Sequence, residues 1–493
     1  MAIFNDPGVY VVQTMKPAPL TPVMPARPSA FIGPMYQVVD QEAESDANTA
    51  IFLEEGGDAE AIVMPYPSLI SAESEVDLPS VKVKLFRKDG RIADITALCE
   101  INVSDVTLDL TRVDVMDELH ILNDDWGGKS DEGDFVGVNG AKIHIEYRAL
   151  RSDLVGRVLA AQGADGVLAT IGKASWQNPL GLAGGIASRL TSEGMYFVPT
   201  SDNVDGDIDM ALALLEPLNV YSPVALSANP LTQQAVIAHC VRMSDPEERQ
   251  FRFAWTYRPF KTKEQLIADG SIDSTASLAE VKLAQVADMV AYAQSIYERR
   301  AAVIPHDFEM EIDGETYWVP GYYLAVAYSA LKSQLPPQQG LTNYPLGGIV
   351  KKLHHSNDYF KPSQLKALSQ GGVFVCLQDT EGAPIRSRFQ VTTNMNNNKT
   401  KQISLVYSVD DYSMGYIATL KSLIGVNNVT PEILEEVELS TIAYASAKRN
   451  AGNIISAKLL MVRQNEDDES QVDVEQDVVF PTPLDRIVLR LRY

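Results

Sequence analysis

Cysteine is scarce in this 493-residue sequence, and the spacing of the few present argues against metal or disulfide chemistry. The three cysteines are Cys99, Cys240 and Cys376, each more than a hundred residues from the next. Because no Cys-x-x-Cys pair exists, the sequence offers neither a zinc ribbon nor a redox motif. We interpret all three as buried or half-buried thiols of a protein in a reducing cytoplasm.

Long apolar runs and basic charge are also in short supply. No stretch approaches the roughly 18 to 20 consecutive apolar residues that a membrane span requires, and the N-terminus lacks the basic and then apolar segments of a signal peptide. The 41 Lys and Arg residues are outnumbered by 65 Asp and Glu, which gives a net charge of −24 and a pI near 4.7. A surface this acidic repels phosphate backbones. We therefore expect neither nucleic acid as a partner nor insertion into a membrane.

The usual catalytic patterns are missing as well. None of the six histidines forms a His-x-x-x-His pair, and no Gly-x-Ser-x-Gly elbow occurs. The adjacent His354 and His355, with Asp358 nearby, are interpreted as a polar surface turn. Gly128-Lys129-Ser130 and Gly172-Lys173 resemble the end of a phosphate-binding loop, but both lack its first glycine.

An acidic stretch superficially matches a calcium loop. Asp205, Asp207, Asp209 and Glu216 occupy ligand positions, but Met210 stands where the loop requires glycine. The acidic N-terminus of a helix explains the same residues. We therefore expect no catalytic residues, no metal and no cofactor.

The period of the apolar residues changes along the chain and indicates where the folded domains lie. Helix and strand patterns alternate three times, with helices over 178–193, 208–215 and 230–243 and strands over 195–198, 220–224 and 251–255. This alternation predicts βαβ units on a parallel sheet. Further patterns predict helices from Ser277, Tyr322, Pro362 and Thr430, a hairpin with Asp313-Gly314 at its tip, and a strand over 373–377.

Both ends of the chain are extended in character. Seven prolines within residues 1–36 forbid a continuous helix, but residues 30–33 form one β-prone run and an earlier run consists of Val9, Tyr10, Val11 and Val12. Near the other end, Gln464 to Asp477 contains seven acids and no base, which we interpret as a solvated loop. The final strand pattern consists of Ile487, Val488, Leu489, Arg490 and Leu491.

A strand at a chain end must satisfy its backbone groups somewhere. It either pairs within its own molecule or adds to the sheet of a neighbour by β-augmentation. The residues alone leave both possibilities open. Arg486, Arg490 and Arg492, near the end of an otherwise acidic chain, favour attraction between like subunits.

Several segments, in order along the chain, resemble contractile tail sheath proteins of bacteriophages. The resemblance spans nearly the whole chain and is densest from about residue 178 onward. It is carried by Asp6-Pro7-Gly8-Val9-Tyr10-Val11, Ala30-Phe31-Ile32-Gly33, Asn178-Pro179-Leu180, Val319-Pro320-Gly321-Tyr322-Tyr323-Leu324-Ala325, Pro336-Pro337-Gln338-Gln339-Gly340-Leu341-Thr342-Asn343, Val391-Thr392-Thr393-Asn394 and Pro483-Leu484-Asp485-Arg486-Ile487.

The resemblance implies a structural protein of a virion tail, assembled in the host bacterial cytoplasm. Such a subunit polymerises as stacked hexameric rings around a tail tube protein, with baseplate and tail terminator proteins as further partners. Contraction drives the tube through the host envelope. Residues 9–12 match the N-terminal arm and 487–491 the C-terminal arm, each expected to add a strand to a neighbouring subunit.

The expected fold is an α/β core of subtilisin-like topology with a parallel sheet, without protease activity. A β-rich inserted domain, an α+β C-terminal domain and extended N- and C-terminal arms complete it. The expected divisions are an N-terminal arm with the first core strand (1–36), an inserted outer domain (37–150), the α/β core (151–335), a C-terminal domain (336–480) and a C-terminal arm strand (481–493). Two alternatives remain: a sheath of a bacterial contractile injection device resembling R-type bacteriocins, and an α/β hydrolase with its site at the strand ends.

Overall fold

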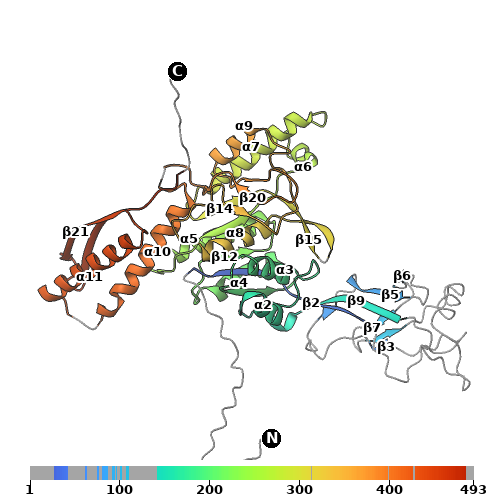
Figure 1. Ribbon diagram of the computed structural model, residues 1–493, viewed down its shortest axis with the longest axis horizontal. Coiled ribbons are helices and arrows are strands. Elements are labelled where there is room, and N and C mark those ends of the chain that lie inside the picture. Colours follow the sequence, from blue (N-terminus) through green and yellow to red (C-terminus); the bar gives the residue numbers. More distant parts are fainter. Residues whose placement is uncertain are drawn as a thin grey trace, which may run out of the picture.

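The computed structural model describes residues 27–42, 62–63, 75–76, 80–86, 92–94, 96, 100–102, 107–109, 142–312, 314–397, 399–425 and 428–484. An α/β body lies at the centre (Figure 1). A lobe containing α10 (Ile403–Leu420), α11 (Pro431–Asn450) and β21 (Ser456–Gln464) extends to one side of it. A ribbon formed by β2 (Tyr36–Glu42) and β9 (Lys142–Leu150) extends to the other.

A four-stranded sheet forms the middle of the body. Its order is β10 (Leu159–Gln162), β11 (Gly194–Thr200), β1 (Ser29–Pro34) and β12 (Ser222–Ala225). Strand β1 pairs in parallel with β11 and with β12, whereas β10 is antiparallel to β11. The strand predicted over 30–33 is therefore confirmed. It lies between β11 and β12, both of which follow it by more than 150 residues in the sequence.

A second parallel pair continues this sheet. Strands β13 (Ala254–Tyr257) and β14 (Ala301–Ile304) pair in parallel. The backbone N–H of Phe253 donates to the carbonyl of Tyr221 at 2.7 Å, next to β12. On the far side of β14, Val303 forms a parallel bridge with Val373. The parallel arrangement predicted from the helix–strand alternation is thus present, although the predicted strand over 373–377 is reduced to this bridge and β19 (Cys376–Leu377).

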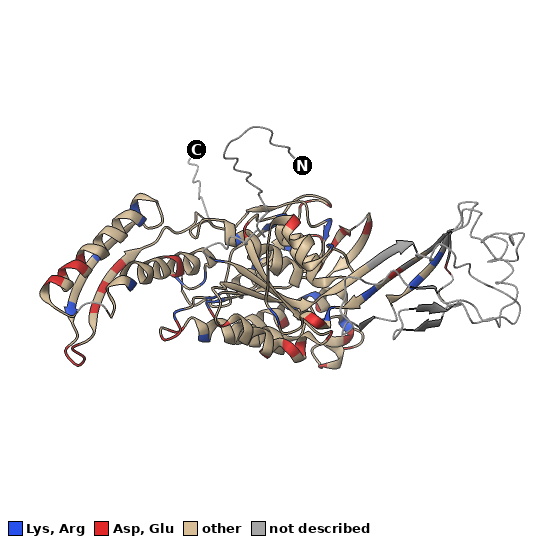
Figure 2. Cartoon of the chain, turned by 90° about the horizontal axis from the view of Figure 1, so that it is seen from below, with Lys and Arg blue, Asp and Glu red and all other residues tan. Residues whose placement is uncertain are grey.

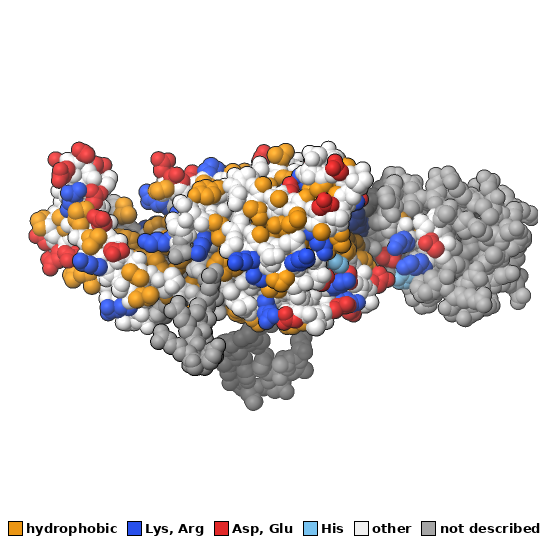
Figure 3. Space-filling view, turned by 90° about the horizontal axis from the view of Figure 1, so that it is seen from above, with side chains coloured by type: hydrophobic (Ala, Val, Ile, Leu, Met, Phe, Trp, Pro, Cys, Tyr) orange, Lys and Arg blue, Asp and Glu red, His pale blue; other side chains and the backbone are white. Residues whose placement is uncertain are grey.

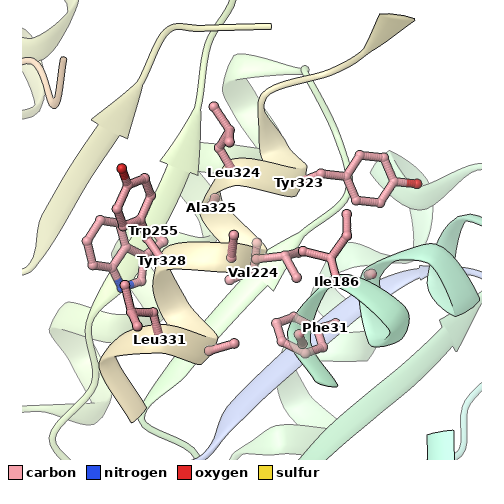
Figure 4. Close-up of a cluster of buried hydrophobic side chains, with 14 of the residues drawn as sticks. Phe31, Ile186, Val224, Trp255, Tyr323, Leu324, Ala325, Tyr328 and Leu331 are labelled. Carbon is pink, nitrogen blue, oxygen red and sulfur yellow. The ribbon is translucent and has the colours of Figure 1, made fainter. Parts of the chain in front are cut away.

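Helices cover both faces of the sheet. Helices α2 (Gly163–Ile171), α3 (Pro179–Ser188) and α8 (Tyr322–Gln334) contribute to the larger apolar core, and α4 (Val204–Leu215) and α5 (Pro230–Met243) to a second one. Figure 4 shows side chains of α8 packed between the sheet and α3. Eleven residues of α8 are buried, so this helix is enclosed almost all round.

Local signals explain several of these helix boundaries. The Asn178 side chain caps α3 by accepting from the Gly181 N–H, and Ser277 and Glu280 form the predicted capping box at the start of α7 (Leu278–Ile296). A methyl group on Gly184 of α3 would lie 2.6 Å from Cγ1 of Val167 on α2. The small residues of α3 therefore allow close packing of α2 and α3.

Most of the remaining elements of the body lie around the second half of the sheet. The predicted hairpin is confirmed as β15 (Phe308–Ile312) and β16 (Glu315–Val319), and β18 (Lys352–Leu353) pairs with β15. The others are η3 (Ser152–Leu154), α6 (Lys263–Ala268), β17 (Pro345–Leu346), α9 (Pro362–Gln370) and β20 (Ile385–Ser387).

The C-terminal lobe corrects one prediction. It consists of α10 (Ile403–Leu420), η4 (Lys421–Leu423), α11 (Pro431–Asn450), β21 (Ser456–Gln464) and β22 (Val472–Val479). The interpretation of 464–477 as a solvated loop is wrong for its second half, because residues 472–477 belong to β22. Valines at 472, 474 and 478 give that strand its alternation, which the acidic residues between them obscure.

The described strands within 37–150 are antiparallel. Strand β2 (Tyr36–Glu42) pairs with β9 (Lys142–Leu150), which also pairs with β5 (Lys82–Phe86) and β4 (Glu75–Val76). The other strands are β6 (Ile92–Asp94) beside β5, and β3 (Ile62–Val63), β8 (Thr107–Asp109) and β7 (Glu100–Asn102) in a separate sheet. The β2–β9 pair joins this β-rich region to the body.

The divisions predicted between domains stay predictions. The larger core contains residues from both sides of the predicted boundary at 335/336, among them Tyr328, Phe374 and Tyr407. Trp255 stacks on Tyr328 and meets the edge of Phe374. The body and the segment after residue 336 therefore share one apolar interior.

Candidate assembly surfaces

The residues predicted to mediate assembly, Val9–Val12 and Ile487–Leu491, lie outside the described residues. The structure does describe where the two terminal segments join the body and which sheet edges are available to accept a strand. These features define the candidate site.

Arg27 is the first described residue and is held tightly. Only 6% of it is exposed. Its Nη2 donates to the carbonyl of Leu335 at 2.8 Å, and its Nη1 pairs with Asp411 of α10 at 3.0 Å. Lys448 of α11 contacts the other oxygen of Asp411 at 2.9 Å. The start of the described chain is thus fixed to the C-terminal lobe.

The other end of the described chain rests on the body. Pro483 lies against Gly340, where an added methyl group would be 3.3 Å from its Cβ. The Gln390 side chain connects this part of the body to α10. Its Oε1 accepts from the Leu341 N–H at 3.0 Å, and its Nε2 donates to Ser404 of α10 at 2.9 Å. Residues 481–484, the first residues of the predicted C-terminal arm (481–493), therefore leave the C-terminal lobe and contact the body before the predicted strand over 487–491.

The hairpin of β21 and β22 forms a sheet of only two strands. Within the described chain, neither long edge of this hairpin carries a third strand. Helix α11 packs against β21, and Tyr412, Tyr444, Val478 and Phe480 lie in the small core beneath it. A bulge between Leu459 and Met461 interrupts the pairing. A two-stranded sheet is of marginal stability by itself, and its open edges can accept further strands.

The outward face of this hairpin is acidic. Glu475 and Asp477 are exposed on β22, and the connection between the strands carries Glu466, Asp467, Asp468 and Glu469. Helix α11 adds acidic residues in its first half. Figure 2 shows red positions along the ribbon of this lobe, and Figure 3 shows red side chains on its surface. Lys458 lies opposite Asp477 in the register, whereas Glu475 lies opposite the uncharged Met461.

Asp205, which the sequence places at a calcium-ligand position, is engaged in structural contacts. The Asp205 carboxylate accepts from Ser227 and Thr232, each at 2.6 Å, and from Asn229 at 2.9 Å, and these hydrogen bonds outweigh burial and lower its pKa. Asp205 lies in the first turn of α4, as the acidic helix N-terminus interpretation predicts. Within the described residues, no group of three or more His, Cys, Asp or Glu is arranged to hold a metal ion.

The histidine pair differs from its prediction. His354 and His355 are half-buried rather than part of a polar surface turn. His354 stacks on Trp318 and contacts Glu309 through Nε2 at 2.9 Å, and His355 packs against the aromatic ring of Phe260. Burial lowers the pKa of His355. These aromatic contacts, which lie between residues far apart in sequence, replace the solvent exposure that we expected.

One cavity of about 350 Å³ borders His355, but no acidic residue lines it. Its walls are Phe260, Lys261, Thr262, Lys263, Ala276, Leu278, Val281, Gln285, His355 and Tyr359. The hydrolase alternative requires acids and a histidine that converge in one pocket, and this cavity does not provide them. No described helix is both long and apolar enough to cross a membrane.

Comparison with known proteins identifies the fold. No family model and no curated protein matches the sequence. Among solved structures, the contracted helical sheath of the anti-feeding prophage matches with a TM-score of 0.52 and 11% identity over 70% of this chain and 90% of that chain. The contracted sheath complex of an extracellular contractile injection system, PVC, matches with a TM-score of 0.52 and 12% identity over 69% and 87%.

A six-fold symmetrised baseplate structure of the anti-feeding prophage also matches, with a TM-score of 0.52 and 10% identity over 69% of this chain and 89% of that chain. The chain therefore has the fold of contractile sheath proteins. The resemblance to tail sheath proteins is confirmed at the level of the fold.

Proposed function

We propose that this protein is a non-enzymatic structural subunit of a contractile sheath. Subunits polymerise as stacked hexameric rings around a tail tube, and contraction drives the tube through the envelope of a host cell. The observation that carries this proposal is the fold shared with two contracted sheaths over about 70% of the chain. The strand order and parallel pairing of β11, β1 and β12 also support the subtilisin-like topology expected for the core.

Assembly in this proposal depends on strands donated by the terminal segments to neighbouring copies. The hairpin of β21 and β22 is the acceptor, because among the described residues no third strand occupies either of its two edges and there are two arms to place. Five backbone hydrogen bonds at roughly 0.5–1.5 kcal/mol each give every donated strand several kcal/mol. Such tethers hold subunits together while their bodies move past one another.

Charge selects the edge that receives the C-terminal arm. In an added strand, Arg490 and Arg492 share one face and Ile487, Leu489 and Leu491 share the other. Beside β22, the apolar face aligns with Val474 and with Val478, which packs on the small core. The basic face then aligns with the exposed Glu475 and Asp477. Opposite charges on neighbouring strands contribute roughly 0.2–1 kcal/mol per pair. The C-terminal arm therefore adds to the β22 edge.

Electron microscopy of the purified protein tests the sheath proposal. Negative stain is expected to show hollow cylinders or short rings for the full chain. Deletion of residues 1–12 or of 487–493 is expected to leave a folded, soluble protein that forms neither, with circular dichroism and gel filtration as controls for folding. Normal tubes from both truncated proteins would contradict the role assigned to the arms.

The particle itself has two candidates. The sequence resemblance favours a phage tail, in which baseplate and tail terminator proteins are further partners and assembly takes place in the host cytoplasm. The match to an extracellular contractile injection system favours a particle without a genome. An assay of DNA in purified native particles distinguishes the two, because only a phage carries packaged DNA together with its tail.

A further inference from the structure

The two ends of the described chain meet the same short segment of the body. Arg27 donates to the carbonyl of Leu335, and Pro483 packs on Gly340. Five residues separate these two contact points, so the chain between them spans at most about 18 Å. The two terminal segments that contain the predicted arm strands therefore contact the body at the two ends of residues 335–340, which we call the junction segment.

A buried lysine holds the junction segment in place. Lys332, in the last turn of α8, has no exposed surface. Its Nζ donates to the carbonyls of Pro336 at 3.3 Å, Pro337 at 2.9 Å and Gln339 at 2.6 Å. The three carbonyl oxygens match the three N–H donors of an ammonium group. Burial, together with the nearby charge of Arg27, lowers the pKa of Lys332 well below its usual range.

The same cluster of contacts ties Lys332 to Arg27. The ring of Tyr407 on α10 lies 5.1 Å from the Lys332 Nζ and 5.9 Å from the Arg27 Cζ, so both cations face one aromatic side chain. Ser329 of α8 donates to Ser29 at 2.6 Å, two residues after Arg27. Helices α8 and α10, the start of the described chain and the junction segment thus form one connected unit.

A lysine at this buried position is energetically unfavourable unless its ammonium group makes specific contacts. Burial of its charge costs several kcal/mol, and an apolar side chain of similar volume is often neutral or stabilising in its place. Its distinctive contribution is to bind three carbonyls of a proline-containing segment that has no secondary structure of its own. The contact therefore fixes the position of a backbone loop.

We propose that Lys332 and Arg27 are positioning residues that make the junction segment a common anchor for both terminal arms. The proposal rests on the sheath function. Strands donated to different neighbours start from one rigid point, so a pull on one arm passes to the other through a few residues and not through the whole body. The spacing between the two tethers stays fixed while the rest of the subunit turns about them.

The first test compares K332M with K282M in the full-length protein. Lys282 is a matched control, because its Nζ also donates to a backbone carbonyl, that of Tyr359 at 2.6 Å, and it contacts the ring of the same residue. We expect K332M to raise the protein concentration needed for tube formation at least tenfold, as measured by sedimentation, and K282M to leave it within twofold. Equal values for K332M and wild type would overturn the proposal.

A second readout does not depend on assembly. Hydrogen exchange of the unassembled protein is expected to show faster exchange in K332M, but not in K282M, for peptides covering residues 27–33 and 476–484 together. Faster exchange confined to residues 335–340 would show that the segment does not hold the chain ends, whatever the outcome for the sheath function. If the wild type forms no tubes, the sheath proposal fails and this measurement still decides the anchor.

If K332M fails to fold, a designed disulfide tests instead whether the contact between residues 340 and 483 persists in the assembly. The Cβ positions at 340 and 483 are 3.3 Å apart, close to the spacing that a disulfide requires. We expect oxidised G340C/P483C to form tubes at the same concentration as the reduced protein, because the contact persists in the assembly. Tubes formed only by the reduced form would overturn a fixed anchor. Wild type treated with the same oxidant controls for the native cysteines.

Discussion

Acid should destabilise this protein through one histidine in its core. His306 is fully buried. Its Nδ1 lies 3.1 Å from the carbonyl of His354, and its Nε2 lies 3.0 Å from the backbone nitrogen of Cys376. Only the neutral ring with its hydrogen on Nδ1 satisfies both contacts, because Nε2 must accept from the Cys376 N–H. A second proton would place two N–H groups against each other.

The size of the effect follows from the change in protonation. Burial lowers the pKa of His306 to about 3, from a usual value of 6.5. Between these values the unfolded chain binds a proton that the folded chain does not, so stability falls as the pH falls below 6.5. At pH 5 the difference is 1.5 units, and at about 1.4 kcal/mol per unit the free energy of unfolding drops by about 2 kcal/mol.

Urea unfolding followed by tryptophan fluorescence measures this change, since Trp255 is buried in the same core. Wild type, H306Q and the control H144Q, which alters a histidine on β9, are each compared at pH 7.5 and pH 5.0. We expect wild type and H144Q to lose about 2 kcal/mol more than H306Q between the two conditions. The same pH dependence in wild type and H306Q would refute the reasoning.

Two further predictions concern the charged groups of the C-terminal lobe and its attachment. Charge reversal on β22 by E475K/D477K is expected to reduce tube formation in sedimentation assays, and adding R490E is expected to restore part of it; no rescue by the second change would argue against the β22 edge as the acceptor. The buried pair of Arg300 and Asp410, with contacts of 2.7 and 2.9 Å, predicts that D410N costs about 3–5 kcal/mol by leaving a buried cation unpaired. Thermal unfolding measures that loss, and a change under 1 kcal/mol would show that Arg300 finds another partner or water.

Local signals in the sequence predicted much of the body and little of the C-terminal lobe. Capping residues and proline mark the starts of α3, α5, α7, α9 and α11, so these helices were predictable. Helix α10 lacks such a mark, because its first residue follows Gln402, which makes no capping hydrogen bond. Its position depends instead on Asp410 and Asp411, which pair with residues 110 and 384 positions away.

One part of the candidate site, the terminal arms, could be predicted from the sequence, and the other part, the junction segment, could not. Alternation and proline placement predict arms at both ends of the chain, and those predictions stay open because the arm residues lie outside the described chain. The junction segment has no pattern that would reveal its role. Lys332 is a single lysine near the end of an apolar helix, and only the fold shows that Arg27 and Pro483 lie on either side of the loop that it binds.

The interior position of β1 has a consequence for synthesis of the protein. Its two partners end at Thr200 and Ala225, well over 160 residues after β1 itself. At the usual 5–20 residues per second, a ribosome needs roughly 10–40 s to make the missing strands. Throughout that interval, β1 is already translated, but the two strands that pair with it are not yet complete. The central sheet of a nascent chain therefore stays incomplete until translation has passed the second partner strand.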